Sequence, residues 1–317
     1  MTSTAAPLSI DCSIVIPAWN AAGFVTDAIK SALAQSGLTL EVLVVDDAST
    51  DGTAAVVRAV QDDRLRLLQR DRNGGAAAAR NDAFAAARGR WIAVLDADDL
   101  MEADRLQQLV SAGDRMGSDL VADNLWCDDG IARTLHIAET LDGKEEEIRL
   151  EDLYREALMF AGGRDYGYLK PLFRRDFLVA HDLRYDTGLA VGEDFQLVAE
   201  CLARGGRYHR LRQAGYIYSR RPGSLSHRLD VGRLEAIAAA DRDFINRFAE
   251  HLTPVERKTI ATRLASVDTA AAFTRAVDAL KRRAFADAWS EVMHRPSALL
   301  LFRIPITDRI ARMMRGR

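Results

Sequence analysis

Mostly apolar runs alternate with stretches of helical periodicity along the first 127 residues. Runs typical of buried strands occupy residues 12–16, 41–45, 65–69, 91–95 and 119–126. Helical patterns lie between them, at residues 22–35, 49–60, 75–87 and 101–116. Because strands that alternate with helices form βαβ units, we predict an α/β fold with a mostly parallel sheet flanked by helices on both faces. We expect Pro17 to end the first strand.

The alternation ends after residue 127. The next elements expected are a polar loop or hairpin, two amphipathic helices and a short strand, at residues 131–148, 150–160, 195–203 and 216–221. From residue 231 onward the pattern is helical, with no strand signal. We therefore predict an α/β domain over residues 1–230, with a nucleotide-binding half at 10–127 and a second half at 128–230. A helical C-terminal region is expected over residues 231–317.

The composition is ordinary for a globular chain. The 317 residues are 48% hydrophobic and 28% charged, and a net charge of −3 gives no reason to expect nucleic acid as a partner. The three cysteines (Cys12, Cys127 and Cys201) are far apart in the sequence and form no C-x-x-C motif. This predicts buried thiols in a reducing compartment. Residues 1–7 do not resemble a signal peptide, and no apolar stretch approaches the length of a membrane span. These features predict a cytoplasmic protein.

The apolar run at residues 91–95 ends directly in Asp96, Asp98 and Asp99. Ligands of open α/β sheets bind beyond the carboxyl ends of the strands, and clustered carboxylates raise one another's pKa unless a cation lies among them. A single aspartate, such as Asp99, suffices to cap the helix expected at residues 101–116. Three acids in four positions favour a divalent-metal site.

Three further groups of candidate residues follow expected strands or begin expected helices. They are Pro17-Ala18-Trp19-Asn20, Asp46-Asp47 and Glu193-Asp194. Taken singly, these acids are equally typical of turns or helix starts, and Trp19 of a core. Taken together, they suit a metal, a phosphate-bearing ligand with a flat ring, and a spare carboxylate for base chemistry.

Five motifs, in this order, resemble the family 2 glycosyltransferases over about residues 10–230. They are Ile16-Pro17-Ala18-Trp19-Asn20, Val44-Val45-Asp46-Asp47-Ala48-Ser49-Thr50-Asp51, Asn73-Gly74-Gly75 with Ala79-Arg80-Asn81, Leu95-Asp96-Ala97-Asp98-Asp99 and Gly192-Glu193-Asp194. The resemblance implies a GT-A (Rossmann-like) fold, a nucleotide-diphosphate sugar donor, Mg²⁺ or Mn²⁺, and inversion at the anomeric carbon. It also implies that residues 128–230 bind the acceptor and carry the base.

The resemblance assigns roles to individual residues. Trp19 would stack on the base, Asp47 would accept from its imide N–H, and Asp194 would be the catalytic base, with Glu193 the next candidate. Asp96 and Asp98 would hold the metal, with His227 as a further ligand. The nucleotide-sugar contacts implied are Pro17, Trp19, Asn20, Asp47, Arg80, Asp96, Ala97, Asp98, Arg221 and His227.

The donor and acceptor follow in outline. Trp19 and Asp47 suit uracil, which favours a UDP-sugar. The Gln-x-x-Arg-Trp signature of processive synthases is absent, which argues for transfer of one sugar at a time. The resemblance further implies a glycan or lipid-linked acceptor at the inner face of the cell membrane, in exopolysaccharide or surface-glycan synthesis.

Two other functions are considered. A sugar-1-phosphate nucleotidyltransferase would carry a Gly-rich loop with Arg or Lys after the first strand, where this chain has Trp19-Asn20. A non-catalytic sugar-nucleotide-binding module would not need Asp96, Asp98 and Asp194 together. The dinucleotide-binding G-x-G-x-x-G and the P-loop motif are absent.

The C-terminal end is basic and amphipathic. From Arg295 onward the chain carries six arginines and one acid, Asp308. A helix from Ile306 would place its apolar residues on one face with arginines beside them. Such a segment either lies in a membrane interface or packs on the protein, and a lipid-linked acceptor favours the membrane.

Overall fold

The computed structural model describes residues 10–161, 163–220 and 230–303. The chain divides into two compact units. The first comprises Met1–Leu153 with Arg164–Ser224, and the second Tyr154–Gly163 with Leu225–Arg317. Each unit is described by itself.

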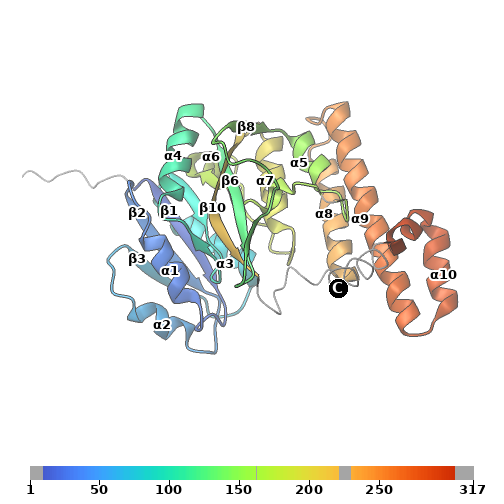
Figure 1. Ribbon diagram of the computed structural model, residues 1–317, viewed down its shortest axis with the longest axis horizontal. Helices are drawn as coiled ribbons and strands as arrows, with labels where there is room; N and C mark the ends of the chain where they lie inside the picture. Colours follow the sequence, from blue (N-terminus) through green and yellow to red (C-terminus); the bar gives the residue numbers. More distant parts are fainter. Residues whose placement is uncertain (1–9, 162, 221–229, 304–317) are drawn as a thin grey trace, which may run out of the picture. The chain divides into compact units, whose positions relative to one another are not determined.

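The first unit is built on one mixed sheet (Figure 1). Its strands follow the order β3-β2-β1-β4-β9-β6-β10-β5, with β7 beside β6 and β8 beside β10. The first four strands along the chain are β1 (Cys12–Ala18), β2 (Leu40–Asp46), β3 (Leu65–Gln69) and β4 (Trp91–Val94). They run parallel to one another, as do β6 (Leu120–Asp128) and β10 (Tyr208–Ser219).

Four short strands complete the sheet in antiparallel pairings. They are β5 (Leu100–Met101), β7 (Arg133–Leu135), β8 (Glu145–Ile148) and β9 (Leu172–Arg174). β9 lies between β4 and β6 and so joins the two parallel parts of the sheet. The α/β fold predicted from the sequence, with its mixed and mostly parallel sheet, is confirmed.

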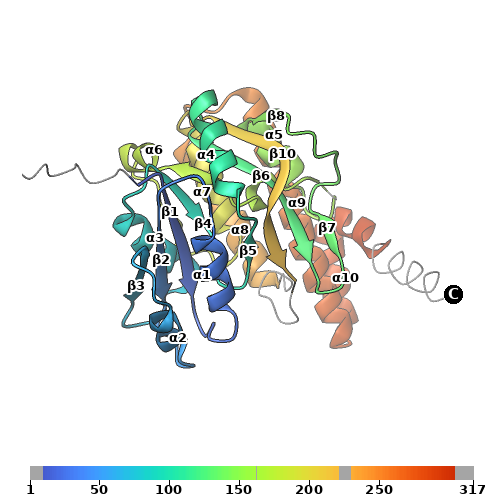
Figure 2. The same ribbon diagram turned by 60° about the vertical axis from the view of Figure 1, so that its left-hand side comes forward.

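Helices cover both faces of this sheet, with α1 and α3 on opposite sides of β1 and β2 (Figure 2). The helices of this unit are α1 (Val25–Leu33), α2 (Thr53–Ala59), α3 (Gly75–Ala86), α4 (Arg105–Met116), α6 (Arg175–Ala180), α7 (Glu193–Ala203) and a 3-10 turn, η1 (Tyr166–Tyr168). Helix α5 (Leu150–Glu156) begins in this unit and ends in the second. The apolar strand residues, such as Ile14, Val42 and Leu120, are completely buried between these layers. All three cysteines are buried free thiols, as expected.

The predicted end of the first strand is wrong. β1 continues through Pro17 to Ala18 and stays paired with β2. Its pairing with β4 ends at Val15, so Pro17 has a strand neighbour on one side only. Proline is tolerated here because no carbonyl group of the sheet needs the N–H that it lacks.

The predicted helix at residues 101–116 begins later than expected. Leu100 and Met101 form β5, which pairs with β10, and the residue at the N-cap of α4 is Asp104. Asp99 therefore does not cap this helix. The short strand expected at 216–221 is also longer, since β10 begins at Tyr208.

The second unit is helical, which confirms the predicted helical C-terminal region as far as the structure describes it. It contains α8 (Val231–Arg247), α9 (Pro254–Lys281), α10 (Phe285–His294) and the 3-10 segment η3 (Pro296–Phe302). Helix α9 begins with a capping box, in which Thr253 and Glu256 each bond the other's backbone N–H. Apolar residues of α8 and α9, including Leu234, Ile237 and Val267, form the core.

Among the residues described, no helix is both long enough and apolar enough to cross a membrane.

Candidate active site

The aspartates that follow β4 occupy different environments. Asp99 is 1% exposed and accepts hydrogen bonds from the Tyr216 hydroxyl (2.7 Å) and the Ser219 backbone N–H (2.8 Å). Burial, and then the charges of Asp96 and Asp98, raise the pKa of Asp99 well above its ordinary value. Asp99 therefore ties the acidic turn to the end of β10, whereas Asp96 and Asp98 are only half-buried.

Arg80 joins two acidic segments that are far apart in the sequence. It projects from α3, and its side chain is 3% exposed. Its Nη2 lies 2.7 Å from Asp96 Oδ1, and its Nη1 lies 2.8 Å from Glu193 Oε1 and 3.4 Å from Asp194 Oδ1. The guanidinium also lies over the Tyr185 ring, 5.1 Å from its centroid. The sequence-predicted acids Asp96, Glu193 and Asp194 are thus brought together around one buried cation.

Lys170 is a second buried cation in the same cluster. Its Nζ lies 2.6 Å from Asp194 Oδ2 and 2.9 Å from Asp96 Oδ2. Each of these two carboxylates is therefore bound on one oxygen by Lys170 and on the other by Arg80. Lysine is rarely buried unless it is paired in this way. We name Arg80, Lys170, Asp96, Glu193 and Asp194 the acid–base cluster.

The backbone at Lys170 is held in an uncommon conformation. Its φ of +51° lies in the left-handed region, which a bulky residue adopts only where its surroundings impose it. The fully buried Arg105 contributes to this by donating to the Lys170 carbonyl oxygen (3.0 Å) while pairing with Asp123 (2.9 Å). Strain of this kind is concentrated at functional sites.

The cluster sets the ionisation of its members. Burial alone would raise the pKa of Asp194, but the charges of Arg80 and Lys170 outweigh it and hold the pKa below its ordinary value. The pKa of Asp96 is lowered in the same way, against burial, by Lys170 and then Arg80. Burial would lower the pKa of Lys170, yet the charges of Asp194 and Asp96 raise it. At neutral pH Asp194 is therefore a carboxylate and Lys170 an ammonium ion.

The local sequence explains how Glu193 and Asp194 reach this position. Gly192 adopts φ +89° at the N-cap of α7, a conformation for which glycine is suited. The two acids then form the first turn of the helix, where its dipole favours negative charge. This arrangement directs both acids toward the cations of the acid–base cluster.

A second group of predicted residues lies at the ends of β1 and β2. Trp19 directly follows β1 and is 56% exposed, so its ring is open to a ligand, while Pro17 is buried within the strand. Asn20 accepts a hydrogen bond from the Thr50 backbone N–H (2.9 Å). The N–H of Asp47 donates to the Ala18 carbonyl (2.8 Å), which places Trp19 and Asp47 at neighbouring strand ends.

Asp47 is held by the glycine motif that the sequence singles out. Its carboxylate is buried and accepts from the backbone N–H groups of Gly74 (3.0 Å) and Gly75 (2.8 Å) and from Arg70 (2.6 Å). The Asn73 side chain donates to the Asp47 carbonyl oxygen (3.2 Å). One physical task of Asn73-Gly74-Gly75 is thus to fix Asp47, and the contact of Asp47 with a base stays a prediction.

The acids after β4 suit a metal in part. Carboxylate oxygens are the ligands that Mg²⁺ and Mn²⁺ prefer. Both oxygens of Asp96, however, already contact cations of the protein. Within residues 10–161, 163–220 and 230–303, no group of three or more His, Cys, Asp or Glu side chains is arranged to hold a metal ion. Arg221 and His227, predicted to bind the donor and the metal, lie outside the described residues.

The sequence analysis missed Lys170. It is the lone charge between Tyr166 and Phe173, in a stretch otherwise made of apolar and aromatic residues and glycine. A lysine in such a stretch signals either an exposed edge or a buried ion pair. Only the fold, which brings this residue beside Asp96 and Asp194, distinguishes the two.

Comparison with solved structures supplies the fold. The structure of S. aureus TarS residues 1–349 in complex with UDP-GlcNAc matches with a TM-score of 0.64 and 17% identity, over 89% of this chain and 90% of that one. The mannosyltransferase PcManGT from Pyrobaculum calidifontis, in complex with GDP-Man and Mn²⁺, matches with a TM-score of 0.58 and 20% identity, over 94% and 80% of the two chains. The fold is that of the GT-A glycosyltransferases.

Sequence comparison supplies the family. The model described as Glycosyl transferase family 2 matches residues 13–175. The chain is 40% identical to the succinoglycan biosynthesis protein ExoO of Rhizobium meliloti (strain 1021), over 96% of this chain and 87% of that protein. It is 42% identical to ExoU, a succinoglycan biosynthesis protein of the same strain, over 73% and 70% of the two chains. The chain therefore belongs to glycosyl transferase family 2 and is a glycosyltransferase, as its motifs predict.

A further relative carries a more specific name. The chain is 41% identical, over 31% of its length and 39% of the relative's, to the Escherichia coli protein WfgD. WfgD is described as a UDP-Glc:alpha-D-GlcNAc-diphosphoundecaprenol beta-1,3-glucosyltransferase. The family decides against the nucleotidyltransferase and the non-catalytic binding module that the sequence left open.

Proposed function

We propose that this glycosyltransferase transfers one sugar, with inversion, from a UDP-sugar to a lipid-linked glycan at the inner face of the cell membrane, during synthesis of an exopolysaccharide or surface glycan. The observation that carries the proposal is the acid–base cluster, in which Asp194 lies within ion-pair distance of the same two cations as Asp96. The names of ExoO, ExoU and WfgD support the pathway and the lipid-linked acceptor.

The donor pocket follows from the strand ends. The exposed indole of Trp19 stacks on the uracil, and Asp47, at the neighbouring strand end, recognises its edge. Arg80 and Lys170, paired with the acids of the cluster, lie beside the acidic turn at which the diphosphate would bind. The complex of TarS with UDP-GlcNAc supports a uridine nucleotide.

Asp98 would hold Mg²⁺ or Mn²⁺ in this proposal, with Asp96 beside it and His227 as a further ligand. The metal, when bound, supplies charge that stabilises the leaving diphosphate. Asp96, with both oxygens bound by protein cations, orients Arg80 and Lys170 rather than acting as the main ligand. The complex of PcManGT with Mn²⁺ supports metal dependence.

Asp194 acts as the base. An acceptor hydroxyl oxygen bonds to the anomeric carbon, the bond from that carbon to the diphosphate breaks with its electron pair going to UDP, and the hydroxyl proton passes to Asp194. Because Arg80 and Lys170 keep Asp194 ionised, it is ready to accept that proton at neutral pH. Glu193, paired with Arg80, is the alternative base.

The test is a donor and product analysis with the full chain. UDP-sugars and GDP-sugars are offered with Mn²⁺ and a diphospholipid-linked glycan, and nucleotide release is measured. We expect turnover of a UDP-sugar, dependent on Mn²⁺ or Mg²⁺, and a product whose anomeric configuration by NMR is opposite to the donor's. A product with the donor's configuration, or turnover of GDP-sugars alone, contradicts the proposal.

A further inference from the structure

Helix α10 in the second unit has an apolar arc that the protein covers only in part. Ala288 and Val292 are buried, at 5% and 7% exposure. Phe285, Trp289 and Met293 are 67%, 65% and 59% exposed. These three residues are spaced by four and therefore share one face of the helix, beside the buried pair. Large apolar side chains gathered on one exposed face mark an interaction surface.

Basic residues border this face. The turn between α9 and α10 carries Lys281, Arg282 and Arg283, all exposed, next to the partly exposed Leu280. From residue 280 to residue 303 the chain has five lysines and arginines and two acids. One of the acids, Glu291, is paired with Arg275 of α9 (2.9 Å). Lys281 is itself paired with Asp278 (3.0 Å), so the positive charge beside the α10 face comes mainly from the exposed Arg282 and Arg283.

The chemistry of this face suits an anionic bilayer. Tryptophan and phenylalanine are favoured at membrane interfaces, and neighbouring cations are attracted to anionic headgroups. A second copy of the chain, seated on the same face by twofold symmetry, would bring two sets of Lys281, Arg282 and Arg283 into one interface. Residues 304–317 carry four arginines and one aspartate. Their positive charge also disfavours them as the partner of a face bordered by Lys281, Arg282 and Arg283.

We propose that the α10 face, made of Leu280, Phe285, Trp289 and Met293 with Lys281, Arg282 and Arg283, binds the surface of an anionic bilayer. The inference rests on the proposed function in one respect, since a lipid-linked acceptor requires access to a membrane. It assigns bilayer contact to described residues of α9 and α10, upstream of the basic segment that the sequence alone singles out.

Vesicle flotation tests the proposal with the full chain. Phosphatidylcholine vesicles with and without phosphatidylglycerol are compared for the native protein and for a Phe285→Ser, Trp289→Ser, Met293→Ser variant. We expect the native protein to float with anionic vesicles in a salt-sensitive manner and the variant to lose at least tenfold in bound fraction. Val255→Ser is the matched control, because Val255 is an equally exposed apolar residue (59%) on α9. Equal flotation of the triple variant and the native protein overturns the proposal.

The charge is tested separately. Arg282→Gln with Arg283→Gln should weaken binding to anionic vesicles several-fold, while Lys258→Gln, an exposed lysine on α9, should not. The fluorescence of Trp289 should shift to shorter wavelength on vesicle addition, and Trp289→Phe should remove this shift while keeping most of the binding. Charge variants that bind anionic vesicles as the native chain does would contradict the choice of an anionic bilayer.

Three results would assign the face differently and overturn the proposal. A chain ending at Arg303 that loses flotation, while the triple variant keeps it, assigns binding to residues 304–317. A native dimer that the triple variant converts to monomer by light scattering, with flotation unchanged, assigns the face to a second copy. A native chain that binds neutral and anionic vesicles equally removes the role of charge.

The outcome is independent of the transfer reaction. Hydrolysis of the UDP-sugar in the absence of vesicles should be equal in the native chain and the triple variant, because these residues lie outside the acid–base cluster. If the native chain floats but transfers no sugar to a lipid-linked acceptor, the proposed function fails and the α10 face stands. If the native chain transfers sugar to the lipid-linked acceptor but does not float with vesicles, the proposed function stands and the assignment of the α10 face fails.

Discussion

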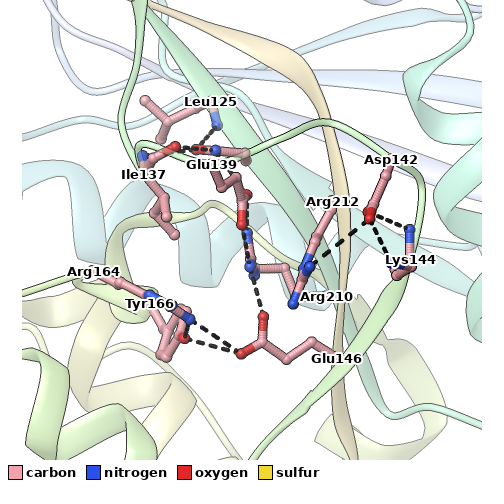
Figure 3. A network of polar contacts seen from close by, with 11 residues as sticks. Leu125, Ile137, Glu139, Asp142, Lys144, Glu146, Arg164, Tyr166, Arg210 and Arg212 are labelled. Atoms are coloured by element: carbon pink, nitrogen blue, oxygen red, sulfur yellow. Dashed lines mark hydrogen bonds and ion pairs between the residues drawn. The ribbon is translucent and has the colours of Figure 1, made fainter.

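Two of the networks of buried cations and acids in the first unit differ in charge balance and location, and we use the difference to separate architecture from chemistry. In one, Arg210 of β10 is fully buried between Glu139 (2.8 Å) and Glu146 (2.6 Å), and Arg164 also contacts Glu146 (Figure 3). In the other, Arg80 and Lys170 hold Asp96, Glu193 and Asp194. Both bury an arginine almost completely, so burial alone does not distinguish them.

Charge balance and location distinguish the two networks. The Arg210 network matches two cations with two acids near the amino end of β10, where it fastens the segment from Glu139 to Glu146 against the strand. The acid–base cluster has three acids for two cations at the carboxyl end of β4. Surplus negative charge at that edge attracts a cation, whereas a balanced network needs none. This difference in charge balance is the one we expect between a ligand site at the end of a strand and an architectural ion-pair network.

The largest expected effect comes from removing the base. Asp194→Asn should reduce sugar transfer by ~10² to 10⁴, the usual contribution of a positioned general base, while UDP binding changes little. Transfer is measured by UDP release and binding by calorimetry. Asp176→Asn is the control, because Asp176 also lies in the first turn of a helix but is 92% exposed. Near-normal transfer by Asp194→Asn would move the role to Glu193.

Asp98→Asn tests the proposed metal site. Loss of a ligand and its charge should abolish the gain in UDP affinity that Mn²⁺ brings and lower transfer by roughly 10-fold to 100-fold. Titration of UDP with and without Mn²⁺ measures the first effect. Asp63→Asn, at an exposed loop position, should behave as the native chain does. A Mn²⁺ response that persists in Asp98→Asn would show that the metal is held elsewhere.

Lys170→Met tests how the cluster sets ionisation. Lys170 lowers the pKa of Asp194, so its removal should raise that pKa and move the acid limb of the pH–rate profile to higher pH. At neutral pH we expect transfer to fall about tenfold, because Asp194 also loses its closest partner. Lys30→Met, an exposed lysine on α1, serves as control. An unmoved acid limb would separate Lys170 from the base.

The smallest effect on transfer is expected from the balanced network. Arg210→Met leaves two glutamates beside each other and should lower the free energy of unfolding by ~3–5 kcal/mol, as the breaking of a buried ion pair does. Under conditions where the variant is folded, its transfer rate should stay within about twofold of the native rate. Urea unfolding and UDP release measure the two quantities.

Arg212→Met, on the same strand but 38% exposed, is the matched control and should change neither quantity appreciably. A large loss of transfer in folded Arg210→Met would erase the contrast between the two networks.

The parts of the fold that sequence predicts are those in which local pattern and burial agree. β1 to β4 are mostly apolar and helices separate them, so their order and type follow from periodicity. β9 and the first half of β10 cannot be predicted in this way, because charged residues such as Arg174 and Arg210 interrupt their apolar pattern. Arg210 is tolerated inside only because glutamates distant in sequence neutralise it.

The candidate site divides in the same way. Asp96, Glu193 and Asp194 are found from motifs, since acids at strand ends and helix starts are visible in the sequence. The role of Lys170 and the burial of Asp99 cannot be found from motifs, because each depends on partners at least 24 residues away in the sequence. The mistaken capping role of Asp99 has this origin, since a local rule was applied to a residue whose partners are Tyr216 and Ser219.

The way in which Asp47 is held has a consequence for redesign of the donor preference. Two of its hydrogen bonds come from the backbone N–H groups of Gly74 and Gly75, and Gly75 adopts φ +82°. Exchange of the Asp47 side chain alone therefore leaves these two backbone N–H groups without the carboxylate that accepts from them. Under the proposed role of Asp47 in base recognition, a swap of nucleotide specificity between relatives would need the aspartate and the Asn73-Gly74-Gly75 loop to be exchanged together.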